Sequence, residues 1–313
     1  MPIPFLRRAA DAALEATIVA SFTRIGPAVR RPLWGWTDPG PQSLVGQVVV
    51  VTGATSGLGV VIAQGVARAG ATVAVVGRNV ERGHGVVADI RAQGLDASFH
   101  QADLSELSDV RTLAENLTNE HERIATLVHN AGALLPERRE TSDGLESTWA
   151  TMVVAPHLLT RLLADRLDRA IWMSSGGMYF QDVQLGDLGW ENRPWNGSRV
   201  YAQAKRAQID LVHEATERGE APLQVAMHPG WADTPGVEAA LPGFRKVMGP
   251  LLRDPEAGAD TAVWLTAAPA SELEPGGFYL DRRARGTVRW PGTATSPTDR
   301  HRLRALVDAQ AAR

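Results

Sequence analysis

From Gln47 onward, short apolar runs alternate with longer segments in which apolar residues recur at helical spacing. The first run, residues 48–51, consists of valine alone, which is typical of a parallel strand buried on both faces. Further strands are expected at 71–76, 97–101, 124–129, 170–174 and 223–227, and helices at about 58–69, 80–93, 108–121, 145–166 and 201–218. Alternating strands and helices predict βαβ units with right-handed crossovers. The sequence therefore predicts an α/β fold: a single Rossmann-type domain with a doubly wound parallel sheet.

The segment before this domain has a different pattern. Apolar residues recur at helical spacing over residues 5–25, with Arg7, Arg8 and Arg24 among the charges between them, and we interpret this stretch as an amphipathic helix. Charges interrupt each apolar run before the ~18–20 residues that a membrane span requires. Two interpretations stay open: the helix docks on its own domain, or it makes a peripheral contact with a membrane.

Proline and glycine are frequent at residues 32–43, which indicates a stiff connector. The chain is thus expected to divide into an N-terminal helix and connector (1–46), a Rossmann domain (47–290) and an irregular C-terminal tail (291–313).

Composition narrows the function classes. Of 313 residues, 44% are hydrophobic and 21% charged, which is ordinary for a soluble globular protein. A formal net charge of −3 argues against a nucleic-acid partner, which would need a basic surface. Cysteine is absent, which excludes disulfides and thiolate nucleophiles, and the eight histidines lack ligand spacing such as HExxH, so we expect no metal site. A cytoplasmic enzyme is the simplest expectation.

A glycine-rich loop follows the first predicted strand and precedes a predicted helix. Gly53 allows a tight turn, Gly57 lets the backbone approach a pyrophosphate, and Gly59 permits close packing of helix on strand. The helix N-terminus then offers free amide donors and partial positive charge to phosphates. The loop residues expected to bind a dinucleotide are Gly53, Thr55, Ser56, Gly57, Leu58 and Gly59.

The end of the second predicted strand indicates which dinucleotide is bound. NAD-binding members of this fold place a carboxylate there for the ribose 2′-hydroxyl. This chain has Gly77 followed by Arg78, and an arginine can form charge-assisted hydrogen bonds with a 2′-phosphate. The expected cofactor is NADP(H).

Tyr201 and Lys205 lie four residues apart in a strongly helical segment, so both side chains lie on one helix face. A nearby cation lowers the pKa of a phenol from its ordinary value of about 10 and suits it to proton exchange with an alcohol or carbonyl. Ser174 and Ser175 follow the apolar run at 170–173 and could bind the same substrate oxygen. We therefore expect a proton-transfer site.

Together these motifs resemble the short-chain dehydrogenase/reductase family over residues 47 to about 285. Residues 52–59 match its TGxxxGxG loop, and the resemblance implies that Ser175, Tyr201 and Lys205 are catalytic. It also implies that Tyr201 and Lys205 contact the cofactor, together with residues elsewhere in the fold. These further residues are Asp103 and Leu104 near the adenine, Asn130, Ala131 and Gly132 beside the central sheet, and Pro229, Gly230 and Thr234 near the nicotinamide.

Residues 174–178 and 228–236 further resemble the retinol-dehydrogenase-like members of the family, with family member 12 among them. The long connection between Ser175 and Tyr201 is shared with them. This resemblance implies a small, lipophilic alcohol or carbonyl substrate. Trp190, Trp195 and Trp231 are equally consistent with flanking such a pocket and with ordinary packing. Relatives are commonly dimers or tetramers, which leaves a homo-oligomer open.

One position departs from the family pattern. The fourth catalytic residue of the family, an asparagine, corresponds to Met152, whose thioether cannot replace the hydrogen bonding of an amide. His157 is a neighbour that could take over its part in proton transfer. Two hypotheses follow: an NADP(H)-dependent oxidoreductase that interconverts an alcohol and a carbonyl, or a nucleotide-binding regulatory protein with weak catalysis.

Overall fold

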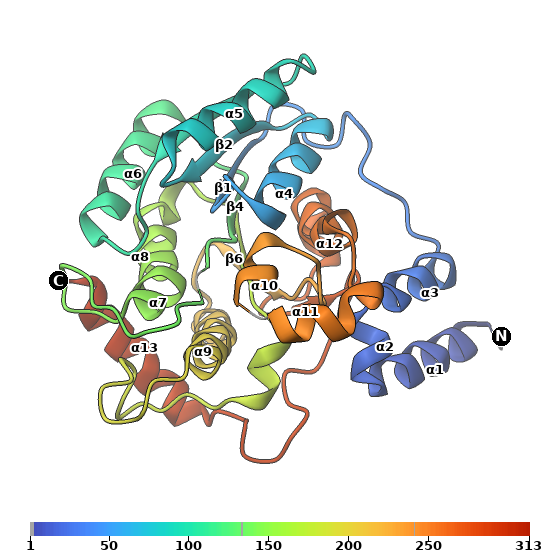
Figure 1. Cartoon of the computed structure of the whole chain (residues 1–313). Coiled ribbons are helices and arrows are strands. Elements are labelled where there is room, and N and C mark those ends of the chain that lie inside the picture. The colour runs from blue at the N-terminus through green and yellow to red at the C-terminus, as the bar shows by residue number, and fades with distance from the viewer. Residues whose placement is uncertain (1–2, 133, 241) are drawn as a thin grey trace.

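The computed structural model describes residues 3–132, 134–240 and 242–313. Its centre is one eight-stranded sheet in the order β3-β2-β1-β4-β5-β6-β7-β8, parallel except for the antiparallel pair β7 and β8 (Figure 1). The strands are β1 (Val48–Thr52), β2 (Thr72–Gly77), β3 (Ala97–Gln101), β4 (Thr126–His129), β5 (Arg169–Met173), β6 (Leu223–Met227), β7 (Phe278–Leu280) and β8 (Arg283–Ala284). The predicted Rossmann-type fold is confirmed, and the six predicted strands are found within two residues of their expected bounds.

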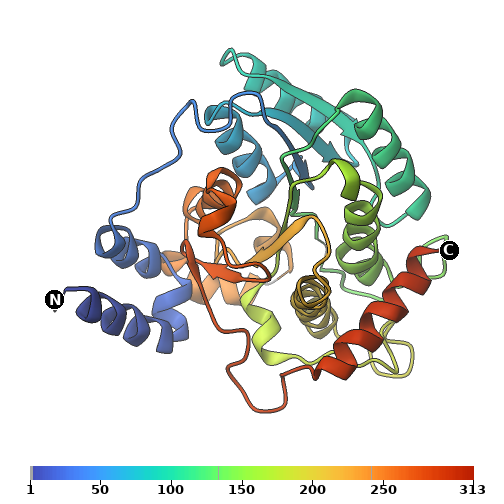
Figure 2. The ribbon, with the colours of Figure 1, turned by 180° about the vertical axis from the view of Figure 1, so that it is seen from behind.

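Helices cover both faces of the sheet (Figures 1 and 2). One layer contains α4 (Gly57–Arg68), α5 (Val80–Arg91) and α12 (Pro255–Ala267), and the other α6 (Leu107–Glu120), α8 (Ala155–Leu162) and α9 (Gly197–Glu217). Strand β1 shows why both layers are needed: Val49 and Val51 pack in the cluster with α4, whereas Val50 packs in the cluster with α6 and α9. The valine-only pattern reflects this double burial.

The strand order reverses between β1 and β4, which are neighbours in the sheet although β2 and β3 intervene in the chain. In open α/β sheets, ligands bind at the carboxyl ends of the strands beside such a switch point. The loops after β1 and β4 therefore mark the place where a cofactor is expected.

The N-terminal segment differs from the prediction of one helix over residues 5–25. It forms three helices, α1 (Ile3–Ala16), α2 (Ile18–Phe22) and α3 (Ile25–Trp34), which pack on one another beside α11 (Pro242–Met248) (Figure 1). We call residues 3–34 the N-terminal arm. The expected connector also begins later, because α3 runs through Pro32 and ends at Trp34.

The C-terminal prediction was wrong as well. In place of an irregular tail, α13 (Pro297–Ala311) lies against α8 and α9 and buries Leu303 and Val307 (Figure 2). Its start is capped by Ser296, whose hydroxyl accepts from the amide of Asp299 at 3.1 Å. The remaining α-helices of the described ranges are α7 (Ser147–Trp149) and α10 (Pro235–Ala240). A π-helical turn spans Ala150–Val154, and short 3-10 helices span Ala164–Arg166, Gly176–Phe180, Gly249–Leu251 and Ala270–Glu272. Across the described ranges, each helix falls short of the length and apolar character needed to cross a membrane.

Candidate active site

The glycine-rich loop lies between β1 and α4, as predicted, and its glycines have separate steric reasons. Gly53 has φ +65°, and a Cβ there would lie 2.8 Å from Cα of Ala131. A Cβ on Gly59 would lie 2.4 Å from the carbonyl oxygen of Gly53, so this glycine permits close packing at the start of α4. Gly57 has φ +55° but only ordinary contacts near its Cβ position, the nearest being Cβ of Thr234 at 3.8 Å.

The first turn of α4 has the properties of a phosphate site. Its N-cap residue, Ser56, makes no side-chain capping hydrogen bond. The first amides of a helix have no intrahelical acceptor and carry the positive end of the helix dipole. These groups fit the pyrophosphate of a dinucleotide.

Asn130 joins the ends of β1 and β4 beside this loop. Its side-chain amide donates to the carbonyl oxygen of Thr52 at 2.9 Å, and its backbone amide donates to the Thr52 hydroxyl at 3.1 Å. The backbone amide of Ala131 donates to the same hydroxyl at 3.1 Å. The segment of residues 130–132 thus fixes the switch point, in agreement with the support of the central sheet that the family resemblance implies.

The expected ribose site lies at the end of β2. A Cβ on Gly77 would lie 2.5 Å from Cγ2 of Thr55, so residue 77 is restricted by the loop as well as by any cofactor. Arg78 is exposed, and its Nη1 lies 3.4 Å from Oδ2 of Asp103. Burial raises the pKa of Asp103, but hydrogen bonds from Ser105 and the charge of Arg78 outweigh it and hold the pKa below its ordinary value. Arg78 therefore already has a carboxylate partner.

Ser175, Tyr201 and Lys205 meet beyond the ends of β5 and β6. Ser175 follows β5 and caps the 3-10 helix Gly176–Phe180, its hydroxyl accepting from the amide of Gly177 at 3.2 Å. Tyr201 lies in the second turn of α9, and Nζ of Lys205 lies 5.5 Å from its ring centroid. The predicted triad is brought together.

The electrostatics of this triad depend mainly on burial. Burial raises the pKa of Tyr201, and a hydrogen bond with Ser175 offsets part of that rise. Burial also lowers the pKa of Lys205 to about 7. Its ammonium group donates to the carbonyl oxygen of Met173. The sequence argument expected Lys205 to lower the pKa of Tyr201, but in the protein alone the net shift of the phenol is upward.

Met152 lies beside Lys205. A Cβ on Gly132 would lie 3.7 Å from Sδ of Met152 and 4.0 Å from Nζ of Lys205. Met152 is fully buried in the π-helical turn, and its carbonyl oxygen accepts from Nε2 of Gln208 at 2.7 Å. His157, the proposed substitute, instead makes a 2.7 Å contact from Nε2 to Asp308.

The loop after β6 returns toward the glycine loop, because a Cβ placed on Gly57 would lie 3.8 Å from Cβ of Thr234. Trp231 packs edge-on to Phe244 of α11, with ring centroids 5.2 Å apart. Trp190 is packed within its own loop: its indole nitrogen donates to the carbonyl oxygen of Pro194 at 2.8 Å. Trp195 donates to the carbonyl oxygen of Leu135 at 3.3 Å.

The sheet topology and this triad define a nicotinamide-dependent dehydrogenase or reductase. The chain belongs to the short-chain dehydrogenase family, whose model, described as short chain dehydrogenase, matches residues 47–240.

Two relatives and one solved structure show how similar the chain is to known proteins. The chain is 37% identical over 277 residues to dehydrogenase/reductase SDR family member 12 of Bos taurus, with 86% of this chain and 87% of that protein covered. It is 31% identical over 265 residues to retinol dehydrogenase 13 of Homo sapiens, covering 79% and 80%. A metagenomic short-chain oxidoreductase in complex with NADP has a TM-score of 0.57 and 25% identity, covering 76% of this chain and 97% of that one. The resemblance predicted from the motifs is confirmed, and the chain is an oxidoreductase of alcohol or carbonyl groups.

Sequence reasoning missed several residues that surround the site. Phe22 comes from the N-terminal arm and Arg253 from the segment just before α12, and both contact the loop after β6. Gln208 lies about one turn beyond Lys205 on α9. Because residues three apart share a helix face, the sequence could have predicted that Gln208 lies near Lys205. Phe22 and Arg253 lie far along the chain from the motifs, so no local pattern predicted that they contact the site.

Proposed function

We propose that this protein is an NADP(H)-dependent oxidoreductase that interconverts a lipophilic alcohol and its carbonyl. The observation that carries the proposal is the convergence of Ser175, Tyr201 and Lys205 at the same edge of the sheet as the N-terminus of α4, which has no side-chain cap. A bound nicotinamide supplies or accepts the hydride. Ser175 and Tyr201 bind the substrate oxygen; the Tyr201 hydroxyl gives it a proton in reduction, and the Tyr201 phenolate takes one from it in oxidation.

The cofactor preference is argued from the end of β2. Residue 77 has no carboxylate, and the exposed side chain of Arg78 is free of burial that would keep it from a 2′-phosphate. An arginine forms strong hydrogen bonds with phosphate. The similarity to an oxidoreductase in complex with NADP supports the same choice.

Lysine at position 205 has two functions in this proposal. Its positive charge lowers the free-energy cost of forming the Tyr201 phenolate. A ribose hydroxyl of the bound cofactor would favour that charge by replacing part of the hydration that burial removes. Its ammonium group also holds the end of β5 through the carbonyl oxygen of Met173, which keeps α9 at a fixed distance from Ser175.

The test is Tyr201→Phe, which removes one hydroxyl and nearly conserves the shape of the side chain. We expect NADPH affinity to persist, while turnover of a panel of aldehydes and ketones falls by about 100-fold or more, the usual size of an acid–base contribution. Wild-type turnover in this variant would contradict the assignment of Tyr201.

A second candidate function, a nucleotide-binding regulatory protein with weak catalysis, is favoured by the position of Met152 beside Lys205. The two candidates differ in one measurement. An enzyme binds NADPH and turns over at least one substrate of the panel efficiently, whereas the regulatory protein binds NADPH but turns over each substrate of the panel weakly or not at all.

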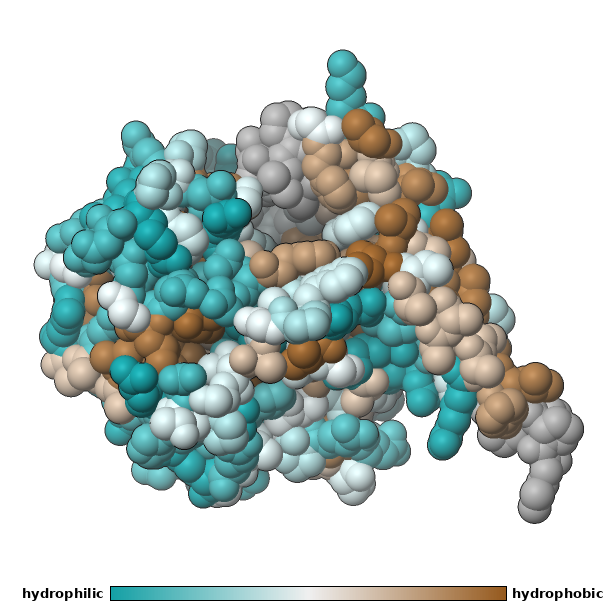
Figure 3. Space-filling model, turned by 90° about the horizontal axis from the view of Figure 1, so that it is seen from below, coloured by the Kyte–Doolittle hydropathy of each residue, from teal (hydrophilic) through white to brown (hydrophobic). Residues whose placement is uncertain are grey.

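We also propose a peripheral membrane contact through the N-terminal arm. Apolar side chains follow the outer side of the N-terminal helices in Figure 3. Phe5 and Leu6 are 73% and 61% exposed, and Arg7 and Arg8 are exposed beside them. Apolar and basic side chains on one surface helix suit an anionic lipid surface. Sedimentation with anionic vesicles tests this, and Phe5→Ser should reduce binding without changing turnover.

A further inference from the structure

The N-terminal arm reaches the candidate active site through Phe22, the last residue of α2. Its side chain is 1% exposed and lies among the aromatic rings of His228, Trp231 and Tyr179, with centroid distances of 4.5, 5.8 and 6.3 Å. His228 and Trp231 belong to the loop after β6, and Tyr179 to the 3-10 helix that follows Ser175. One residue of the arm thus contacts two segments of the site.

The ring of Phe22 occupies the space that a side chain at residue 176 would take. A Cβ on Gly176 would lie 2.5 Å from Cε2 and 3.1 Å from Cδ2 of Phe22. Gly176 directly follows Ser175, whose hydroxyl bonds the amide of Gly177 and the phenol of Tyr201. The turn that carries the serine therefore rests on the ring of Phe22.

The backbone of Phe22 holds the second segment. Its carbonyl oxygen accepts from the amide of Trp231 at 2.7 Å and from Nε of Arg253 at 2.9 Å. Arg253 also donates to the carbonyl oxygens of Ser21 at 2.6 Å and Thr23 at 3.2 Å. The last carbonyls of a helix lack intrahelical donors, so this guanidinium caps α2.

Arg253 links this cap to the loop that leads to Thr234. Its amide donates to the carbonyl oxygen of Trp231 at 2.8 Å, and its carbonyl oxygen accepts from the amide of Asp233 at 2.9 Å. The loop is thus held between α2 on one side and Arg253 on the other. Any displacement of α2 shifts Trp231 and the residues after it.

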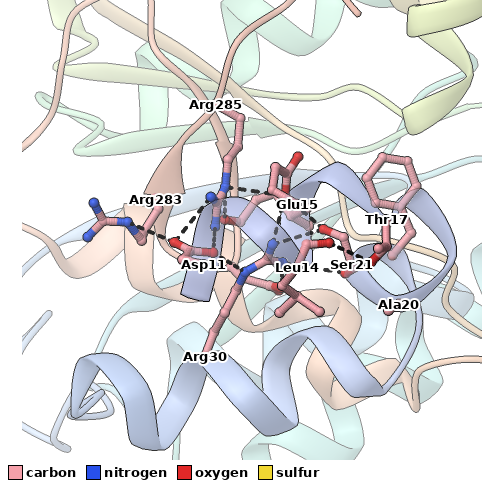
Figure 4. A network of polar contacts seen from close by, with 12 residues as sticks. Asp11, Leu14, Glu15, Thr17, Ala20, Ser21, Arg30, Arg283 and Arg285 are labelled. Carbon is pink, nitrogen blue, oxygen red and sulfur yellow. Dashed lines mark hydrogen bonds and ion pairs between the residues drawn. The ribbon is translucent and has the colours of Figure 1, made fainter. Parts of the chain in front are cut away.

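A buried ion network fixes the arm in this position. Figure 4 shows Arg30 of α3 between Asp11, Glu15 and Ser21, at 2.7, 2.7 and 2.9 Å. Its third carboxylate partner, at 2.6 Å, is Asp281, which also accepts hydrogen bonds from Arg253. Burial alone would raise the pKa of Asp11, but hydrogen bonds and charge from Arg30 and Arg285 hold that pKa below its ordinary value.

We propose that Phe22 is a positioning residue for the alcohol–carbonyl reaction: its ring sets the turn that carries Ser175, and its backbone sets the loop that leads to Thr234. This role rests on the proposed function, because it assumes that Ser175 binds the substrate oxygen. It makes the N-terminal arm part of the active site, although the sequence pattern placed the arm outside the dinucleotide-binding domain.

The first test compares Phe22→Ala with Phe278→Ala. Phe278 is equally buried at 1% exposure and contacts Tyr179 and His228 from β7, so it controls for loss of aromatic packing. We expect Phe22→Ala to lower kcat about tenfold or more, the scale on which misplaced catalytic groups reduce rates, while the Kd for NADPH changes less than twofold. Phe278→Ala should lower Tm and leave kcat within about twofold. Assays well below each Tm separate positioning from unfolding.

The second test uses the contact between residues 22 and 176. Gly176→Ala should push the ring away and lower kcat, because its Cβ enters the space of Cε2. In the double variant with Phe22→Ala the methyl group has room, so kcat should be at least about threefold higher than in Gly176→Ala alone, a coupling expected for residues in contact. Phe22→Leu, which folds more readily, should give an intermediate kcat.

The outcomes are distinct. A wild-type enzyme that turns over no substrate overturns the proposed function and this inference together. An active wild type, with kcat unchanged in Phe22→Ala or with independent effects of the two substitutions, overturns only the positioning role. A lower Tm with an unchanged kcat in Phe22→Ala would show that Phe22 contributes packing alone.

Discussion

Asp281 offers a clean test of how the N-terminal arm is held. It lies in the turn between β7 and β8 with φ +52°, a conformation that asparagine tolerates better than most side chains. Asp281→Asn therefore keeps the backbone and nearly the shape of the side chain while it removes the negative charge. The change isolates the electrostatic contribution of one buried carboxylate.

The magnitude follows from the contacts. The carboxylate accepts from Arg253 at 2.6 and 3.0 Å and from Arg30 at 2.6 Å, and the three side chains are at most 2% exposed. Removal of one partner from a buried ion pair costs about 3–5 kcal/mol, because the remaining charge stays desolvated. Arg30 keeps Asp11 and Glu15, so most of the loss falls on Arg253. We expect the free energy of unfolding to fall by about 3 kcal/mol.

Urea unfolding followed by circular dichroism measures this change, and limited proteolysis should cut the arm faster in the variant. Glu137→Gln is the matched control: it breaks an ion pair with Arg139 in which both side chains are more than 60% exposed, worth ~0–1 kcal/mol. If Asp281→Asn costs no more than this control, the buried network does not hold the arm, and the reasoning is refuted.

Three further predictions concern the site. Arg78→Ala should weaken NADPH at least tenfold, about 1.4 kcal/mol, and leave NADH unchanged; an intact preference would contradict the NADP(H) assignment. Met152→Asn should raise turnover severalfold, since a fivefold gain needs only about 1 kcal/mol off the barrier. Equal turnover of variant and wild type, with a primary deuterium isotope effect showing that hydride transfer limits the rate, would contradict this prediction. The pKa of about 7 for Lys205 means that the folded protein binds fewer protons than the unfolded chain from about pH 7 to 10. The free energy of unfolding of the cofactor-free wild type should therefore rise with pH relative to Lys205→Met, by at most about 1.4 kcal/mol per unit; a flat difference would refute the shift.

The sheet could be predicted because β1, β2, β4, β5 and β6 carry their own apolar signals and are buried on both faces, whereas the edge strand β3 is only partly buried. Strand β8 has two residues, Arg283 and Ala284, and no such pattern. The arm was predicted as one helix because local spacing does not show the break after Phe22, where Arg253, 231 residues later, binds the last carbonyls of α2.

Part of the candidate site could be predicted from local motifs, and part depends on contacts between distant residues. Ser175, Tyr201 and Lys205 lie in local motifs, so their association followed from the topology of a parallel sheet. Arg30 could not be predicted, because an arginine in a helical pattern is expected in solvent, whereas its side chain is fully buried by three carboxylates from two distant parts of the chain.

The contact between Gly77 and Thr55 restricts how cofactor choice can evolve in this lineage. A carboxylate at residue 77 needs a Cβ, and that atom would lie 2.5 Å from Cγ2 and 3.0 Å from Oγ1 of Thr55. A single substitution toward an NAD-type sequence therefore forces the Thr55 side chain in the glycine-rich loop to move. Replacement of Thr55 by a smaller residue relieves this contact, so a carboxylate at residue 77 fits more easily after a change at residue 55 than before it.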